Sequence, residues 1–76
     1  LMPTLDQLKP GDSAAVEEVG GSPALVQRLY EMGLLEGETV EVLAAAPLGD
    51  PLEIRVGNTR LSLRRQEAAG VRVAPR

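Results

Sequence analysis

Hydrophobic residues recur at two different periods along this chain, and each period predicts a different kind of element. In the segment 22–33, Leu25, Leu29 and Met32 recur at the i, i+4 and i+7 spacing of one helix face. Gln27 and Arg28 between them are polar, so the face is amphipathic. The spacing therefore predicts a helix with a single apolar side.

Both ends of this helix carry recognisable capping residues. Ser22 can accept a hydrogen bond from a free backbone N–H, and Pro23 at the first helical position loses nothing by lacking one. At the other end, Gly33 supplies a left-handed cap, and Leu34 is then placed to contact Leu29. We predict a helix from Pro23 to about Met32.

Elsewhere apolar and polar residues alternate or form short β-rich runs, which predicts strands separated by Gly, Pro and Asn turns. In the second of them, Val40, Val42 and Ala44 are expected to face inward, and Glu41 and Leu43 outward. The five predicted strands are 13–19, 39–45, 52–56, 59–63 and 71–73.

The third and fourth strands form a predicted hairpin around Gly57-Asn58, a two-residue turn with Gly first. This register places Arg55 opposite Arg60. Like charges directly across a ladder are unfavourable unless a diagonal acid such as Glu53 offsets them. We therefore expect either such an acid or a partner surface that uses the arginines.

The remaining segments predict two single helical turns, one at Leu5–Leu8 before the Pro10-Gly11-Asp12 turn and one within Arg65–Gly70. Together the elements predict a mainly β fold: a small, five-stranded, partly open SH3-like barrel with one short helix between its first and second strands. Residues 1–76 form one domain. The expected core is Leu8, Val16, Leu25, Leu29, Met32, Leu34, Val40, Val42, Ile54, Val56, Leu61, Leu63, Val71 and Val73.

Composition removes most enzyme chemistry from consideration. The 76 residues include no Cys and no His, so the chain has no thiolate, no imidazole ligand and no neutral-pH imidazole base. No spacing joins a nucleophile to a base among the carboxylates, Ser, Thr, Tyr30 and Lys9. We expect no catalytic residue and no enzymatic activity.

The apolar runs are too short to span a bilayer, and Asp6 and Lys9 interrupt any signal-peptide core. We expect a soluble cytoplasmic protein. Leu1 in front of Met2 is typical of an expression remnant, so the natural start is expected at Met2.

The net charge of −3 hides a division along the chain. Residues 1–54 hold two basic and ten acidic residues, whereas residues 55–76 hold six arginines and the single acid Glu67. The arginines could serve an anionic partner. Equally, Glu41 or Glu53 could neutralise them across the sheet, because strands distant in sequence become neighbours there.

Four motifs in order resemble the FeoA (ferrous iron transport protein A) family over nearly the whole chain. They are Leu5-x-x-Leu8-x-x-Gly11, Gln27-Arg28-Leu29-x-Glu31-Met32-Gly33-Leu34-x-x-Gly37, Ala46-Pro47-Leu48-Gly49-Asp50-Pro51, and Leu61-Ser62-Leu63-Arg64-Arg65-x-Glu67-Ala68.

The resemblance implies a small cytoplasmic accessory protein that binds and modulates the membrane ferrous iron transporter FeoB through protein contacts. The sequence carries no phosphate loop of the G-x-x-x-x-G-K-[ST] type that a GTPase would need. The same fold is similar to the C-terminal regulatory domain of iron-dependent transcriptional repressors, and that similarity sets the alternative function.

Seven residues are candidates for partner binding. In the loop 46–51, Leu48 gains little from exposure, although Pro and Gly-Asp also simply build a turn. Tyr30 is the only aromatic residue and can anchor an interface. Arg64 and Arg65 could both be solvated, or could face an acidic partner or anionic headgroups at the cytoplasmic membrane face. The full set is Tyr30, Met32, Leu48, Gly49, Asp50, Arg64 and Arg65.

Three further expectations concern partners. Nucleic acid is disfavoured, because the pI is about 4.8 and Tyr30 alone provides no stacking platform. Any divalent ion would be held weakly by carboxylates such as Glu17, Glu18, Asp50 or Glu53. Strand alternation places the adjacent Glu17 and Glu18 on opposite faces, so this pair does not chelate by itself, and we expect no high-affinity metal and no cofactor. The outward-facing Leu43 and Leu48 make weak self-association an open alternative.

Overall fold

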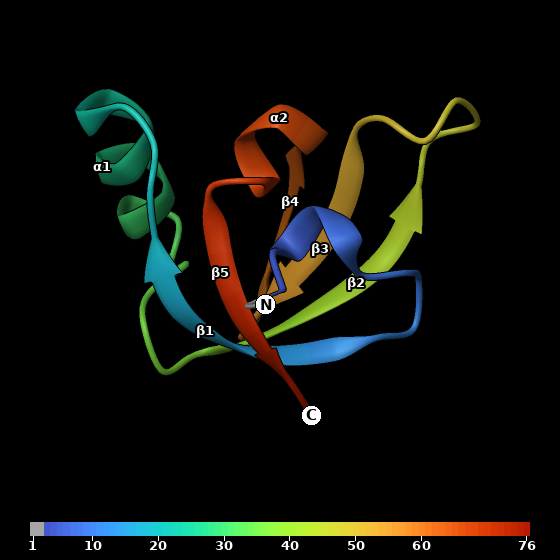
Figure 1. Ribbon diagram of the computed structural model, residues 1–76, viewed down its shortest axis with the longest axis horizontal. Helices are drawn as coiled ribbons and strands as arrows, with labels where there is room; N and C mark the ends of the chain where they lie inside the picture. The colour runs from blue at the N-terminus through green and yellow to red at the C-terminus, as the bar shows by residue number, and fades with distance from the viewer. Residues whose placement is uncertain (1–2) are drawn as a thin grey trace.

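Five antiparallel strands form one sheet in the computed structural model, which describes residues 3–76 (Figure 1). The expected chain start at Met2 lies outside the described residues. In chain order the elements are η1 (Leu5–Gln7), β1 (Ser13–Val19), α1 (Pro23–Glu31), β2 (Thr39–Ala45), β3 (Leu52–Val56), β4 (Thr59–Leu63), α2 (Arg65–Ala68) and β5 (Val71–Pro75).

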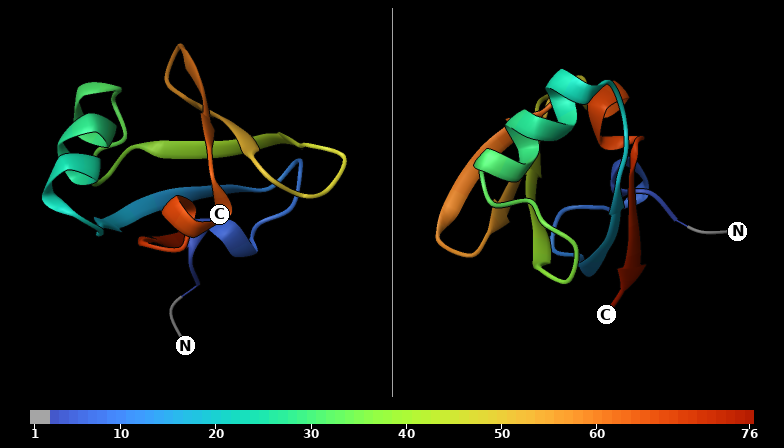
Figure 2. Two further views of the ribbon diagram at one scale, coloured as in Figure 1. Left: turned by 90° about the horizontal axis from the view of Figure 1, so that it is seen from above. Right: turned by 90° about the vertical axis from the view of Figure 1, so that its left-hand side faces the viewer.

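The strand order in the sheet is β4-β3-β2-β1-β5, and α1 follows β1, so the predicted five-stranded SH3-like architecture is confirmed. The sheet curls, so that the β3–β4 hairpin and the β1–β5 pair lie on either side of α1 (Figure 2). η1 and α2 are the two predicted helical turns. The last strand continues to Pro75, two residues beyond its predicted end.

Every element contributes to one continuous core of buried apolar side chains. Met32 was expected in this core but is 38% exposed, because α1 ends at Glu31 and Met32 is its C-terminal cap. Leu25 is half-buried and packs against the core. The prediction omitted the buried residues Leu5, Ala14, Val19, Leu52 and Ala68.

Two register shifts in the sheet change which side chains face inward. The first lies between Val16 and Glu18 in β1, and the second lies in β2, just before Ala44. Glu17 and Glu18 are therefore both exposed, although simple alternation placed them on opposite faces. Ala44 is likewise exposed instead of facing inward, and Ala45 packs against the core.

Acidic residues on neighbouring strands pair with the three arginines that lie within the strands. Arg55 lies opposite Arg60, as predicted, and Glu41 pairs with Arg55 at 2.6 Å while Glu53 pairs with Arg60. These pairs make a partner unnecessary as an explanation for the two arginines. In the same way, Arg72 in β5 forms an ion pair with Glu18 in β1 at 2.8 Å.

Candidate functional site

The most exposed large apolar side chain within residues 3–76 lies on the loop between β2 and β3. Leu48 is 97% exposed, at the tip of a loop that projects away from the sheet (yellow in Figure 1). The loop closes on itself through two backbone hydrogen bonds, Ala46 N to Pro51 O at 3.0 Å and Gly49 N to Ala46 O at 2.6 Å. Gly49 has a φ of +87°, which favours glycine at this position.

One arginine side chain fastens this loop to the rest of the molecule. Arg65, at the start of α2, donates from Nε to the Gly49 carbonyl and from Nη1 to the Asp6 carbonyl at 2.6 Å. In return, a carboxylate oxygen of Asp50 accepts a hydrogen bond from the Arg65 backbone N–H at 2.9 Å. The loop, η1 and α2 are therefore joined at a single point.

The neighbouring arginine behaves differently. The Arg64 side chain is 67% exposed, and its Nη1 lies 3.9 Å from an Asp50 carboxylate oxygen, at the outer limit of an ion pair. Its backbone N–H is bonded to the Glu67 side chain at 3.0 Å, which caps α2. Arg64 thus remains a largely free cation beside the loop that carries Leu48.

The structure brings five of the seven predicted site residues together around this loop: Leu48, Gly49, Asp50, Arg64 and Arg65. Their geometry divides them by role. Leu48 and Arg64 are exposed, whereas Arg65 is half-buried and, with Asp50, holds the loop in place. The sequence alone gave both arginines the same interpretation.

The other two predicted residues, Tyr30 and Met32, lie at the C-terminal end of α1. Both Figure 1 and the left view of Figure 2 place α1 at the opposite end of the molecule from the 46–51 loop. Each side chain is 38% exposed, and Leu35, which the sequence analysis did not select, is 42% exposed. Leu35 directly follows the buried Leu34. The sequence signal that could have identified Leu35 is this second consecutive Leu after the helix cap, since two neighbouring side chains rarely both enter the core.

Tyr30 is held by an ionised neighbour. Its hydroxyl donates a hydrogen bond to a Glu36 carboxylate oxygen at 2.7 Å. This bond raises the pKa of Tyr30 above its ordinary value, with further contributions from desolvation and from the charges of Glu36 and Glu18. The same bond lowers the pKa of Glu36.

Arg28 connects the two helices. Its guanidinium pairs with Glu67 in α2 at 2.8 Å, and not with Glu31, although the i, i+3 spacing along α1 would allow that pair. Glu31 instead accepts from the Gln27 side chain at 3.3 Å.

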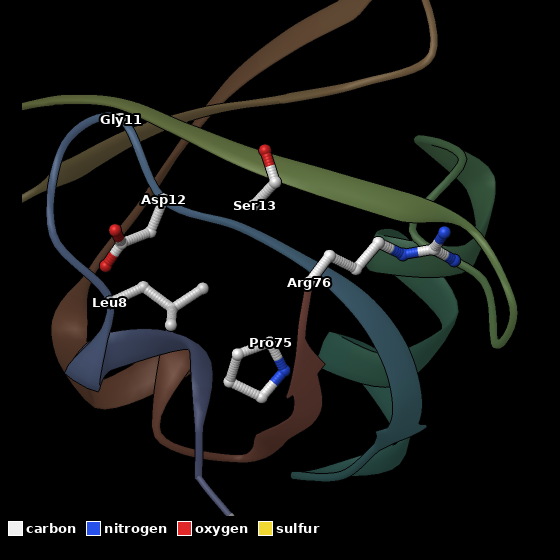
Figure 3. A pocket seen from close by; sticks show the side chains of 6 residues that line it. All are labelled: Leu8, Gly11, Asp12, Ser13, Pro75 and Arg76. Carbon is white, nitrogen blue, oxygen red and sulfur yellow. The ribbon is translucent and has the colours of Figure 1, made fainter.

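A shallow hollow near the C-terminus offers no reactive arrangement (Figure 3). The Asp12 carboxylate accepts from the Lys9 backbone N–H at 2.8 Å, and the Asp12 and Arg76 side chains point in opposite directions. The lining residues are Leu8, Gly11, Asp12, Ser13, Pro75 and Arg76.

The carboxylates considered as metal ligands do not converge. Glu18 and Glu53 pair with arginines, and Asp50 accepts from the Arg65 backbone. Across residues 3–76, no group of three or more Asp, Glu, His or Cys side chains is arranged to hold a metal ion. None of the helices in the same part of the chain is long and apolar enough to cross a membrane.

Comparison with known proteins yields one family. The model of the FeoA domain matches residues 4–75. A curated relative from Porphyromonas gingivalis, an Fe(2+) transport protein A/Fe(2+) transporter FeoB fusion protein, is 39% identical over 69 residues, which are 91% of this chain. The chain spans only 8% of the length of that relative.

Solved structures agree in fold. A FeoA protein from Chlorobium tepidum is 42% identical with a TM-score of 0.92, covering 96% of this chain and 70% of that one. A zinc complex of Stenotrophomonas maltophilia FeoA is 39% identical with a TM-score of 0.78, covering 93% and 88% of the two chains. It is described as a procaryotic SH3 domain protein and put forward as a bacterial ferrous iron transport activating factor.

A manganese-dependent transcriptional repressor shares the fold alone. It is 16% identical with a TM-score of 0.89, covering 99% of this chain and 41% of that one.

Proposed function

We propose, from the premise that this chain belongs to the FeoA family, that it is a cytoplasmic accessory protein of ferrous iron uptake that binds the membrane transporter FeoB. The observation that carries this proposal is the fusion of a 39% identical FeoA domain to FeoB in one polypeptide. A covalent link holds a domain at high effective concentration next to its partner, which is useful when the two bind each other.

The chemistry of the chain supports action by contact. With no His and no Cys, it lacks the side chains that most often transfer protons, hold transition metals or act as nucleophiles. Influence on a transporter then depends on a surface that the transporter recognises.

The loop that carries Leu48 is the surface best suited to recognition. An apolar side chain presented by a braced loop can enter a partner pocket without first having to be ordered. The exposed Arg64 beside it favours a pocket bordered by carboxylates. We therefore infer that FeoB presents an apolar socket with an acidic rim.

The proposal is tested by replacing Leu48 with Asp. Detergent-solubilised FeoB from the same genome is immobilised, and its affinity for the wild-type chain and for Leu48→Asp is measured. Loss of a central apolar anchor costs about 2 kcal/mol or more, so the Kd should rise roughly thirtyfold. Circular dichroism checks that both proteins are folded.

Leu35→Asp is the matched control, because Leu35 is also an exposed leucine but lies at the α1 end of the molecule. We expect its Kd to stay close to that of the wild type. Loss of binding in Leu35→Asp alone would move the docking surface to α1, and unchanged binding in Leu48→Asp would refute the proposed surface.

The repressor alternative receives less support. The manganese-dependent repressor resembles this chain in fold only, at 16% identity, whereas the FeoA protein from Chlorobium tepidum shares 42%.

A further inference from the structure

The conformation of the 46–51 loop depends on a side chain outside it. Arg65 lies 16 positions after Gly49 and 59 after Asp6, and its guanidinium donates to the carbonyls of both. We propose that Arg65 is the positioning residue of the docking loop: it fixes the loop so that Leu48 is presented to the partner. This inference rests on the proposed function.

The partners of Arg65 distinguish it from the other arginines. Its guanidinium donates to two uncharged backbone carbonyls, so its role is not to neutralise a carboxylate. Within residues 3–76, four other arginines pair closely with an acidic side chain, namely Arg28, Arg55, Arg60 and Arg72, and Arg64 lies 3.9 Å from the carboxylate of Asp50.

The contact is also reciprocal. The Arg65 side chain donates to the loop at Gly49, and the loop returns a carboxylate, that of Asp50, to the Arg65 backbone N–H at 2.9 Å. Movement of the loop would break both bonds together. A planar guanidinium can serve two acceptors in fixed directions, which the single ammonium of lysine does not reproduce.

Fixing the loop matters because its own bonds are few. Two backbone hydrogen bonds close it, and Gly49 adds conformational freedom at its tip. An unbraced loop would have to lose that freedom on binding, which weakens affinity without removing any contact with the partner. The effect of Arg65 should therefore be felt only through Leu48.

A double-mutant cycle tests this dependence. The Kd for solubilised FeoB is measured for the wild type, Arg65→Lys, Leu48→Ala and the double variant. We expect Arg65→Lys to raise the Kd about tenfold when Leu48 is present, and less than about twofold when position 48 is Ala. Arg55→Lys is the matched control, since Arg55 is exposed and pairs with Glu41 toward the end of β3 that leads away from the loop; its Kd should not change.

Amide hydrogen exchange supplies a second readout in the free protein. Exchange at Gly49 N, which bonds to Ala46 O within the loop, should become about tenfold faster in Arg65→Lys. Exchange at Val16 N, which bonds to Glu38 O in the sheet, should stay unchanged.

The possible outcomes separate the two proposals. General destabilisation by Arg65→Lys would raise the Kd by the same factor in both Leu48 backgrounds, and that result would overturn the positioning role. An unchanged Kd with faster Gly49 exchange would also overturn it, while leaving FeoB binding intact. No effect of Leu48→Ala itself would instead refute the docking surface of the proposed function.

Discussion

At the scale of single residues, the two consecutive arginines Arg64 and Arg65 have different roles. Arg64 ends the approach to α2 and projects into solvent, whereas Arg65 opens α2 and turns its guanidinium toward the carbonyls of Asp6 and Gly49. Consecutive residues at the end of a strand point to opposite sides, which separates the two. Only one of them is therefore available to a partner.

Tyr30 offers a residue-scale prediction with a direct optical readout. It is the only Tyr, and the chain has no Trp, so tyrosinate absorbance reports Tyr30 alone. The hydrogen bond to Glu36, more than desolvation or charge, raises the pKa of Tyr30 above 10.0. In Glu36→Ala we expect that pKa to fall toward 10.0, and an unchanged titration curve would show that the bond does not form in solution.

The same pair predicts how stability depends on pH. The pKa of Glu36 is lowered by its bond to Tyr30. The contribution of Glu36 to the stability of the fold is therefore present above pH 4.5 and is lost as the pH falls through the lowered pKa. The raised pKa of Tyr30 gives a contribution that is present below pH 10.0 and is lost as the pH rises through the raised value. The free energies of unfolding of the wild type and of Glu36→Ala, measured by urea titration, should therefore converge at both low and high pH.

At the scale of elements, a close backbone approach joins the end of α2 to the end of β1. Gly20 N donates to Gly70 O at 2.8 Å. A Cβ added at Gly70 would lie 2.7 Å from Gly20 O, while one added at Gly20 would lie 3.0 Å from Gly70 O. Neither glycine needs a positive φ here, so the constraint is space alone.

We therefore expect graded destabilisation by two alanine substitutions. Gly70→Ala should lower the free energy of unfolding by about 1–3 kcal/mol, because the added atom meets backbone that cannot rotate away. Gly20→Ala should cost less. Urea titration at constant m-value measures both, and equal stability of Gly70→Ala and the wild type would contradict the close approach.

At the scale of the whole molecule, the curled sheet places two sets of exposed apolar residues at opposite ends. Leu48 lies on the loop at one end, and Tyr30, Met32 and Leu35 lie around the end of α1 at the other. The core that separates them receives side chains from every element. The fold therefore presents two separate sets of exposed apolar side chains.

The absence of His and Cys gives a prediction for the molecule as a whole. Chelation of divalent metal with EDTA should leave the Tm of the purified chain unchanged within about 1 °C, because no bound ion then contributes to folding. Anaerobic titration with Fe²⁺ should show no stoichiometric binding. Tight one-to-one capture of Fe²⁺ by the monomer would contradict this expectation.

Local chemistry within the sequence determined the elements and most of the core. The Ser22-Pro23 start, the Gly33 cap and the Gly57-Asn58 turn each act over a few residues, so their effects are readable without the fold. The direction of side chains in the sheet was predicted wrongly at two places, both at β-bulges. There one extra residue shifts the alternation, and no single residue type marks the position.

Only the tertiary structure decided which partners the arginines bind in segments distant along the chain. Arg28 forms its ion pair with Glu67 and not with Glu31, and the Arg65 guanidinium binds two backbone carbonyls, one of them 59 positions away. Backbone carbonyls carry no residue identity, so no sequence pattern could reveal them as partners. The chain specifies its elements through neighbours in sequence, whereas the bracing of the Leu48 loop exists only once the curled sheet brings η1, that loop and α2 together.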